Sequence, residues 1–445
     1  MNLRVLRDFV VDGRRDLTGA GIAVAALTAV LYLTFAIGSH PDAFGFNQWR
    51  HLRPSESLAP VIGLLVAGSL ALGAAASVRT GSRVADEIWL AALAVGAGAV
   101  FFILQTHFLN ADGKMFAWRF RDIPATNGAF VTHDELLELY VHSRVWYYTH
   151  LWWGWDVPRS YRPVSCAAGA VCVWLLCRFS RRQPPGFGIV FVPGMLSGAY
   201  MQLFFGEVEN YTLIAMVMMM YLVAADRFLK REARLWWPTM AIAVAMCFHL
   251  LAGWTLPGLL YLFWVQWRRS RDPFELTVSA GVFVAIGAAV LGYFHFHGLP
   301  VTYFISSHAG SALRMVDVWV DRTLPVDYYL QQFNLLFLLC PAVGIGVLLL
   351  VSNRFVPGQI DEMTTFLAIV AGMLLLLQTV WKAQLGVYED WNLFATGGMC
   401  VAALIWRAVA MRAESGPARG IALTLAGLYS LHTYAWIVAN HALPL

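Results

Sequence analysis

The chain has 445 residues, of which 59% are hydrophobic and only 13% are charged, and its formal net charge is +4. A typical soluble domain carries about 25% charged residues, so this composition excludes a soluble enzyme and a disordered chain. The sequence has no block of Lys and Arg, so no nucleic-acid partner is expected. The six Cys lie in apolar runs without a CxxC pair, which predicts small core side chains and neither disulfides nor a zinc site.

Long apolar runs predict helices that cross a membrane, because a span needs about 20 apolar residues. In chain order the predicted spans are 18–38, 58–78, 87–107, 163–178, 187–205, 211–226, 236–250, 254–267, 276–297, 330–352, 363–381, 391–409 and 420–439. Several are short, which indicates tilted or broken helices. The first is too long for a signal-peptide core, so we expect it to be retained. The predicted fold class is an all-α polytopic membrane protein with about 13 transmembrane helices.

Basic residues in short loops predict the orientation, because they favour the cytoplasmic side. With the N-terminus in the cytoplasm, 20 of the 31 Lys and Arg fall in inside loops, and every short loop agrees. Eight of the others fall in two long outside loops, 108–162 and 298–329, where the rule is weak. This predicts a multi-pass protein of the cell (inner) membrane whose C-terminus lies outside.

The two long outside loops exceed what a connector needs. Within the first, residues 133–152 have apolar side chains at helical spacing and charged and His side chains on the other face. That pattern predicts an amphipathic helix at the membrane interface. A protein that keeps its irregular polar backbone on one side is expected to work on that side.

Placing an ionisable residue at membrane depth costs free energy, so each such residue near a span is expected to have a structural or functional role. Asp112 belongs to an Asp-Gly pair and is predicted on a tight turn, either as a catalytic base or as an ordinary turn residue. Glu207, Asn210 and Tyr211 share one face if their segment is helical. Glu209 points elsewhere, unless the backbone is broken there.

Two further groups lie near predicted span ends. His249 is either a satisfied core histidine or a ligand-binding residue. Asp390 follows Glu389, and carboxylates at a helix N-terminus also stabilise the helix dipole. The predicted topology, derived from Lys and Arg alone, nevertheless puts these groups and the acidic residues above at the outer face. Residues without a function would divide between the two faces.

Three stretches resemble membrane glycosyltransferases of the GT-C class, multispanning enzymes that use polyprenyl-phosphate sugars. Asp112-Gly113 resembles the Gly-Asp-Gly turn of that class, with Ala111 in place of the leading Gly. Residues 205–211 are similar to a Phe-Gly-Tyr-Val-Glu-Asn-Tyr motif of uncharacterised members. Residues 389–394 are similar to their Asp-Trp-Asp-Leu-Phe motif, with Asn392 in place of the second Asp.

The resemblance covers about 86–400, and this range implies a domain organisation. Residues 1–85 would be an N-terminal two-helix addition, and 86–400 a GT-C-like transmembrane core with the outer loops 108–162 and 298–329. Residues 401–445 would form C-terminal helices.

The activity implied by the resemblance is hexosyl or pentosyl transfer from a polyprenyl-phosphate donor to a hydroxyl of a glycan, lipid or protein acceptor at the extracytoplasmic face. Asp112 would be the general base. The substrate-binding candidates are Glu207, Glu209, Asn210, Tyr211, His249, Asp390, Trp391, Lys114 and Lys382, with Arg119 as a further cation for the donor phosphate. No residue is assigned to a metal and no cofactor is certain. A divalent cation, Mg or Mn, is left open as a ligand of the carboxylates.

The alternative function is a multispanning transporter or lipid flippase, which would also place carboxylates in spans. A transporter predicts related halves and charges near the middle of the membrane. The two halves of this sequence do not align, and its charges gather at one face. A structural scaffold would explain the apolar bulk but not the outer carboxylates.

Overall fold

A computed structural model describes residues 58–107, 109, 111–120, 135–298, 326–351, 360–381, 386–413 and 415–442. In these ranges every regular element is a helix, which confirms the predicted all-helical class. The predicted span 18–38 and most of the loop 298–329 lie outside the described residues.

Eight helices are long and apolar enough to cross a membrane. They are α3 (Leu58–Ser77), α4 (Arg83–Ile103), α7 (Val157–Ser180), α9 (Thr212–Leu229), α12 (Pro273–Phe296), α16 (Glu362–Val380), α17 (Ala395–Arg412) and α18 (Gly416–Ala442). The shorter apolar helix α10 (Trp236–Phe248) runs beside α9 and α12. A polytopic helical bundle is therefore confirmed, whereas the count of 13 spans stays a prediction.

Two predicted spans are broken into shorter helices. Region 187–205 forms α8 (Phe187–Met195) and the 3-10 helix η3 (Ala199–Phe204), and region 330–352 forms α14 (Val326–Leu339) and α15 (Val343–Val351). Region 254–267 forms one helix, α11 (Leu256–Ser270), which follows the 3-10 helix η4 (Leu250–Thr255).

Each of these two breaks has a physical reason. A Cβ on Gly198, between α8 and η3, would lie 2.4 Å from the carbonyl oxygen of Leu339, so only glycine allows these backbones to meet. Pro341 follows the end of α14, and proline cannot continue a helix because it lacks the N–H.

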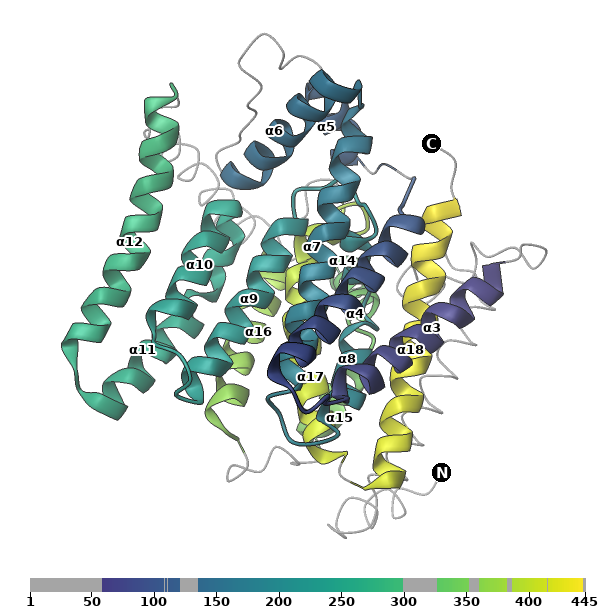
Figure 1. Cartoon of the computed structure of the whole chain (residues 1–445), viewed down its shortest axis with the longest axis vertical. Coiled ribbons are helices and arrows are strands. Elements are labelled where there is room, and N and C mark those ends of the chain that lie inside the picture. Colours follow the sequence, from purple (N-terminus) through teal and green to yellow (C-terminus); the bar gives the residue numbers. More distant parts are fainter. Residues whose placement is uncertain are drawn as a thin grey trace.

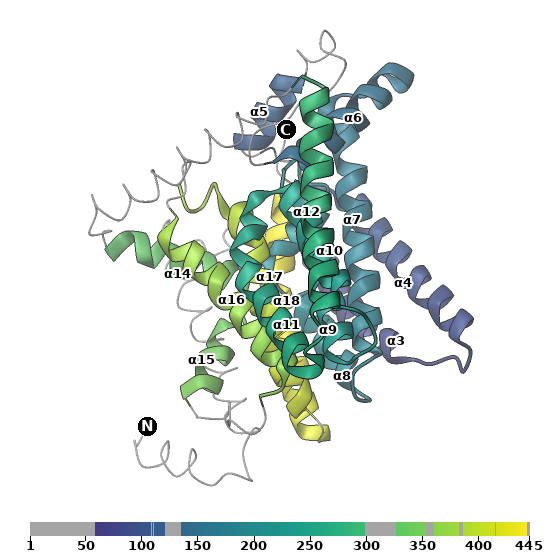
Figure 2. The ribbon, with the colours of Figure 1, turned by 90° about the vertical axis from the view of Figure 1, so that its left-hand side faces the viewer.

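The centre of the bundle is formed by α7, α8, α9, α17 and α18, and α12 stands at one edge (Figures 1 and 2). In α17 most of the apolar window is buried, whereas in α12 only 6% of it is. An apolar helix with so little protein around it is suited to contact with lipid. The helix α3, expected in an N-terminal addition, contacts α8 and α18. The predicted domain limits stay a prediction.

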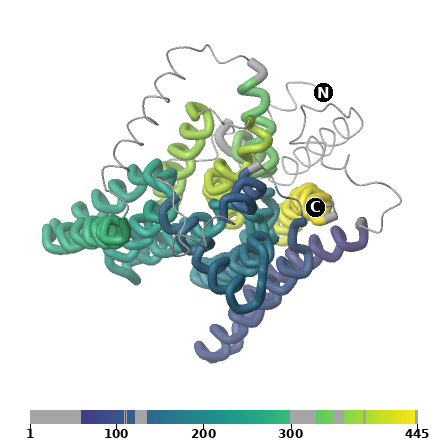
Figure 3. Tube along the Cα trace, turned by 90° about the horizontal axis from the view of Figure 1, so that it is seen from above, coloured from purple at the N-terminus to yellow at the C-terminus, as the bar shows by residue number. Residues whose placement is uncertain are grey.

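The two ends of the bundle differ in charge. One end, at the bottom of Figure 1, is formed by the connections α3–α4, α7–α8, α9–α10, α11–α12 and α17–α18, which carry most of the described Lys and Arg. Several form ion pairs there, such as Arg181 with Asp86 (3.2 Å) and Lys230 with Asp226 (3.0 Å). The opposite end carries α5 (Ala111–Arg119) and α6 (Leu136–Trp153), which lie over the centre of the bundle when it is seen from above (Figure 3). This second end, called the acidic end, also contains segment 205–211, which precedes α9, and segment 386–394, which precedes α17. His249 lies at the same end, next to Tyr211 and Glu135.

The helix α6 confirms the predicted helix in the first outside loop but corrects its orientation. Its polar residues Glu138 and His142 are buried, whereas Trp152 and Trp153 are more than half exposed. Tyr148, Trp152 and Trp153, near the end of α6, therefore face outward, as expected at a membrane interface, whereas Trp146 is buried. The polar face turns inward because Glu138 forms hydrogen bonds with another helix.

Candidate functional site

Asp112 lies in the first turn of the helix α5 and not on the predicted tight turn. A carboxylate in this position interacts favourably with the helix dipole, which helps a short helix to form. Phe116 and Phe120, one and two turns further on, are buried against Tyr161, with ring centroids 6.4 and 6.2 Å apart. These contacts fix α5, and with it Asp112, over the start of α7.

Asp390 lies close enough to Asp112 to act on it electrostatically, although the two come from distant parts of the chain. Burial, as the larger cause, and the charge of Asp390 together raise the pKa of Asp112 to about 6. Asp390 is 8% exposed and immediately precedes the 3-10 helix η6 (Trp391–Phe394). It makes no capping hydrogen bond there, so its position is not explained by capping the helix.

Segment 205–211 is a buried, non-helical connection, so the predicted shared helical face is wrong. Gly206 has a φ of 75°, which ends the preceding 3-10 helix, and α9 begins only at Thr212. The backbone is broken at this point, which was the alternative for Glu209. Glu207 accepts a hydrogen bond from Gln202 Nε2 (2.7 Å).

The side chains of Glu209 and Asn210 are buried at the end of this segment. Asn210 Oδ1 has no hydrogen-bond partner among the described residues. An unsatisfied buried polar atom costs about 1–3 kcal/mol. Such atoms in native structures usually mark a water or a ligand site.

Glu138 is a site residue that was missed from the sequence. Its carboxylate accepts hydrogen bonds from the backbone N–H groups of Leu213 (2.8 Å) and Ile214 (3.0 Å), the first turn of α9. Burial raises the pKa of Glu138 well above its usual value, whereas the two N–H donors act in the opposite direction. Glu138 thus ties α6 to the N-terminus of α9.

His142, one turn after Glu138, stacks on Tyr161 with the ring planes parallel and the centroids 3.5 Å apart. Its Nε2 lies 3.7 Å from Glu138 Oε1. Burial lowers the pKa of His142 to about 3, so the ring is neutral at pH 7.

Tyr161, on α7, shows that the acidic residues form one group. Its hydroxyl is buried, has no hydrogen-bond partner among the described residues, and interacts electrostatically with four carboxylates. These are Glu138, Glu209, Glu135 and Asp112. The carboxylates that act on this phenol come from α5, from α6 with its N-cap Glu135, and from segment 205–211.

His249 lies at the acidic end, between α10 and η4. Its Nδ1 accepts a hydrogen bond from the N–H of Leu251 (3.1 Å), and its Nε2 lies 3.7 Å from Glu135 Oε1. The ring stacks on Tyr211 at a centroid distance of 5.1 Å. An Nδ1 that accepts leaves Nε2 to carry the proton, which faces Glu135.

The remaining candidates are more dispersed. Lys114 and Arg119 are exposed on α5, and Trp391 is buried against Trp436 with centroids 5.1 Å apart. Lys382 lies outside the described residues.

The described residues contain no group of three or more His, Cys, Asp or Glu arranged to hold a metal ion. Asp112 and Asp390 offer two carboxylates close enough to interact. That donor set fits only a cation that keeps several waters and takes further ligands from a substrate, as Mg²⁺ commonly does.

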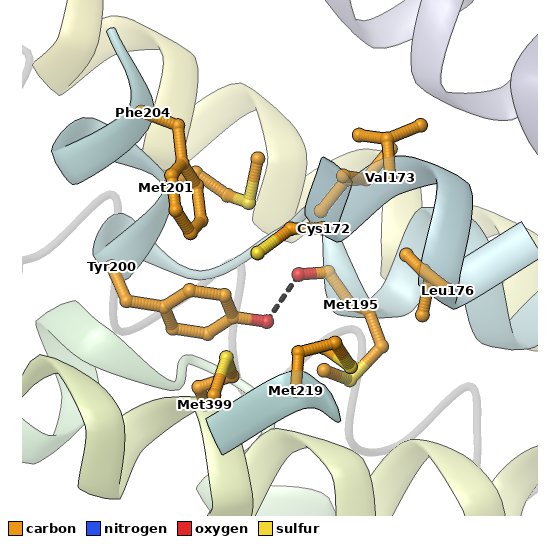
Figure 4. Close-up of a pocket in the computed structure, with 10 residues that line it drawn as sticks. Cys172, Val173, Leu176, Met195, Tyr200, Met201, Phe204, Met219 and Met399 are labelled. Atoms are coloured by element: carbon orange, nitrogen blue, oxygen red, sulfur yellow. Dashed lines mark hydrogen bonds between the residues drawn. The ribbon is translucent and has the colours of Figure 1, made fainter. Parts of the chain in front are cut away.

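A cavity of about 20 Å³ lies deeper in the bundle and is distinct from the acidic end (Figure 4). Its lining is apolar and rich in Met, with Met195, Met201, Met219 and Met399 around it. The hydroxyl of Tyr200 donates a hydrogen bond to the Met195 carbonyl oxygen and is therefore satisfied. This space holds about one water and is too small for a sugar or a lipid.

No protein-family model matches the chain, and no curated protein matches it. Among solved structures, the crystal structure of ArnT from Cupriavidus metallidurans bound to undecaprenyl phosphate is similar, with 16% sequence identity and a TM-score of 0.41. The similarity covers 81% of this chain and 78% of that chain.

Proposed function

We propose that this protein is a membrane glycosyltransferase of the GT-C type, which moves a sugar from a polyprenyl-phosphate donor to an acceptor hydroxyl. The observation that carries the proposal is the convergence of three sequence stretches at one end of the bundle. The GT-C-like motifs are held by Asp112, segment 205–211 and Asp390. Asp390 acts electrostatically on Asp112, and both Asp112 and Glu209 of segment 205–211 act on Tyr161.

Asp112 is the proposed general base. A hydroxyl acceptor is a weak nucleophile unless its proton leaves as it attacks the anomeric carbon. A carboxylate whose pKa is raised to about 6 is still ionised at pH 7 and accepts a proton more readily than an ordinary Asp. The phosphate leaves as an anion, so no strong acid is required at the donor.

The buried polar groups around Asp112 are the proposed sugar site. Glu209, Asn210 and Tyr161 are buried in the structure, and the Asn210 Oδ1 and the Tyr161 hydroxyl have no partner among the described residues, so we propose that they hydrogen-bond to sugar hydroxyls when the donor binds. His249 and Tyr211 are proposed to contact the donor as a stacked pair. A divalent cation at Asp112 and Asp390, completed by the donor phosphate, stays part of the proposal.

We place the acidic end on the extracytoplasmic side of the cell membrane, because the opposite end carries most of the described Lys and Arg. The N-terminus would then be cytoplasmic. The polyprenyl chain of the donor would lie in the bilayer beside the apolar helices.

The direct test is release of polyprenyl phosphate by the purified chain in detergent. We expect release from one or more polyprenyl-phosphate sugars of a hexose and pentose panel when an acceptor is supplied, and release slower by about 10²–10⁴-fold in the Asp112→Asn variant. Added EDTA shows whether a divalent cation takes part. Transbilayer movement of the lipid in vesicles, without release by any member of the panel, would replace the proposal with a flippase.

A further inference from the structure

Arg162, on the first turns of α7, carries an unsatisfied charged edge at the acidic end. Its Nε and Nη2 are buried, and neither has a hydrogen-bond acceptor among the described residues. Leaving two buried guanidinium donors without acceptors costs free energy, because they have lost their hydrogen bonds to water. They lie on one edge of the group, in the arrangement that binds two oxygens of one phosphate or carboxylate.

Neighbouring residues fix the position of the Arg162 side chain, but none of the described residues forms a hydrogen bond with its Nε and Nη2 edge. Gly206 approaches its stem so closely that a Cβ there would lie 3.1 Å from Arg162 Cγ. Glu207 and Asp156 act on the guanidinium electrostatically, but neither forms an ion pair with it within the described residues. Glu207 is instead hydrogen-bonded to Gln202.

Arg162 is also next to Tyr161, the residue on which the acidic side chains converge. The cations favoured from the sequence are less suited to a fixed phosphate. Lys114 and Arg119 are exposed on α5, where water screens their charge. His249 faces the carboxylate of Glu135.

We propose that Arg162 binds the phosphate of the lipid donor through its Nε and Nη2 edge. This inference rests on the proposed function and names one of its binding residues. The whole residue is partly exposed, so a change in its terminal torsion angles brings this edge to the surface where a lipid phosphate arrives. The phosphate then supplies the acceptors that the protein lacks and sits beside segment 205–211.

The test is binding of polyprenyl phosphate and of polyprenol, which lacks the phosphate, to detergent-solubilised protein. We expect Arg162→Gln to weaken polyprenyl phosphate binding by about 10–100-fold, the value of hydrogen bonds to a charged group, and to leave polyprenol binding unchanged. Arg162→Lys keeps the charge but loses the paired donors, so an intermediate loss is expected. The matched control is Arg159→Gln on the same helix, where the guanidinium stacks over Trp155.

Labelling of arginine in the wild-type protein by phenylglyoxal, read by mass spectrometry, gives an answer that does not depend on a folded variant. Polyprenyl phosphate should protect Arg162, and polyprenol should not. Equal labelling with both lipids, or affinity within two-fold of wild type in Arg162→Gln, would overturn the inference. Protection by inorganic phosphate alone would make this a free-phosphate site and overturn the lipid assignment.

The two proposals fail in different ways. If the wild-type protein binds no polyprenyl phosphate, both the proposed function and this inference are wrong. If the wild-type protein binds it and Arg162→Gln binds it equally well, only the role of Arg162 is wrong.

Discussion

Replacing Asp112 by Asn is expected to reduce sugar transfer by about 10²–10⁴-fold, the usual contribution of general-base catalysis. Asn has nearly the size of Asp and keeps its hydrogen-bonding oxygen, but it cannot accept the proton of the acceptor hydroxyl. Donor binding should stay within a few-fold of wild type. Transfer rates and donor affinity measured in the same detergent separate the two effects.

The same variant should be at least as stable as the wild type at pH 7. The pKa of Asp112 is raised to about 6 in the folded chain, so ionising it opposes folding once the pH exceeds its ordinary value of 3.8. Asn has no charge to bury. Its advantage in thermal unfolding should appear between pH 4 and 6 and persist above. Transfer close to the wild-type rate would move the base elsewhere, and a less stable variant would indicate a structural role.

Replacing Glu138 by Ala is expected to loosen the acidic end. The change leaves the N–H groups of Leu213 and Ile214 at the buried start of α9 without an acceptor. Leaving such donors unsatisfied costs about 1–3 kcal/mol each, so the midpoint of thermal unfolding should fall by several degrees. Gln keeps one acceptor oxygen and should give about half the loss.

The matched control for Glu138 is Glu87→Gln, which removes a half-exposed ion pair with Arg178 (3.2 Å). Pairs of this kind contribute about 0–1 kcal/mol, so a small change is expected. Transfer should also fall in Glu138→Ala, because α6 adjoins Glu135 and Tyr161. An unfolding midpoint equal to that of wild type would show that Glu138 does not hold α6 to α9.

The positions of most helices were predictable because a membrane helix must hide its backbone within one long apolar run. The breaks were not predictable from hydropathy. The close approach of Gly198 to Leu339 joins residues far apart in sequence, and an apolar run gives no sign of it.

The helix α6 shows a different limit. Its amphipathic pattern predicted the helix correctly, but a polar face is assumed to meet water. In the fold, Glu138 meets two backbone donors at the start of another helix. The i, i+4 spacing of Glu138 and His142 was the signal available, but the sequence does not show what that face touches.

The candidate site was predictable only in part. Asp112, segment 205–211 and Asp390 stood out because charged groups beside apolar runs are rare. Tyr161 and Arg162 did not, because they precede a span where aromatic and basic residues are ordinary. Their importance depends on the packing of α5, α6 and α7, which brings the carboxylates around Tyr161.

The most direct test of Asp112 as the base is the pH dependence of kcat/KM for transfer, measured in the wild type and in Asp390→Asn. The base must be ionised, so kcat/KM of the wild type should fall about ten-fold per pH unit below pH 6. Removing the charge of Asp390 lowers the pKa of Asp112, so this acid limb should move to lower pH in the variant, yet stay above 3.8 because burial persists. A wild-type profile that is flat between pH 5 and 7, or a limb at the same pH in both proteins, would contradict the assignment.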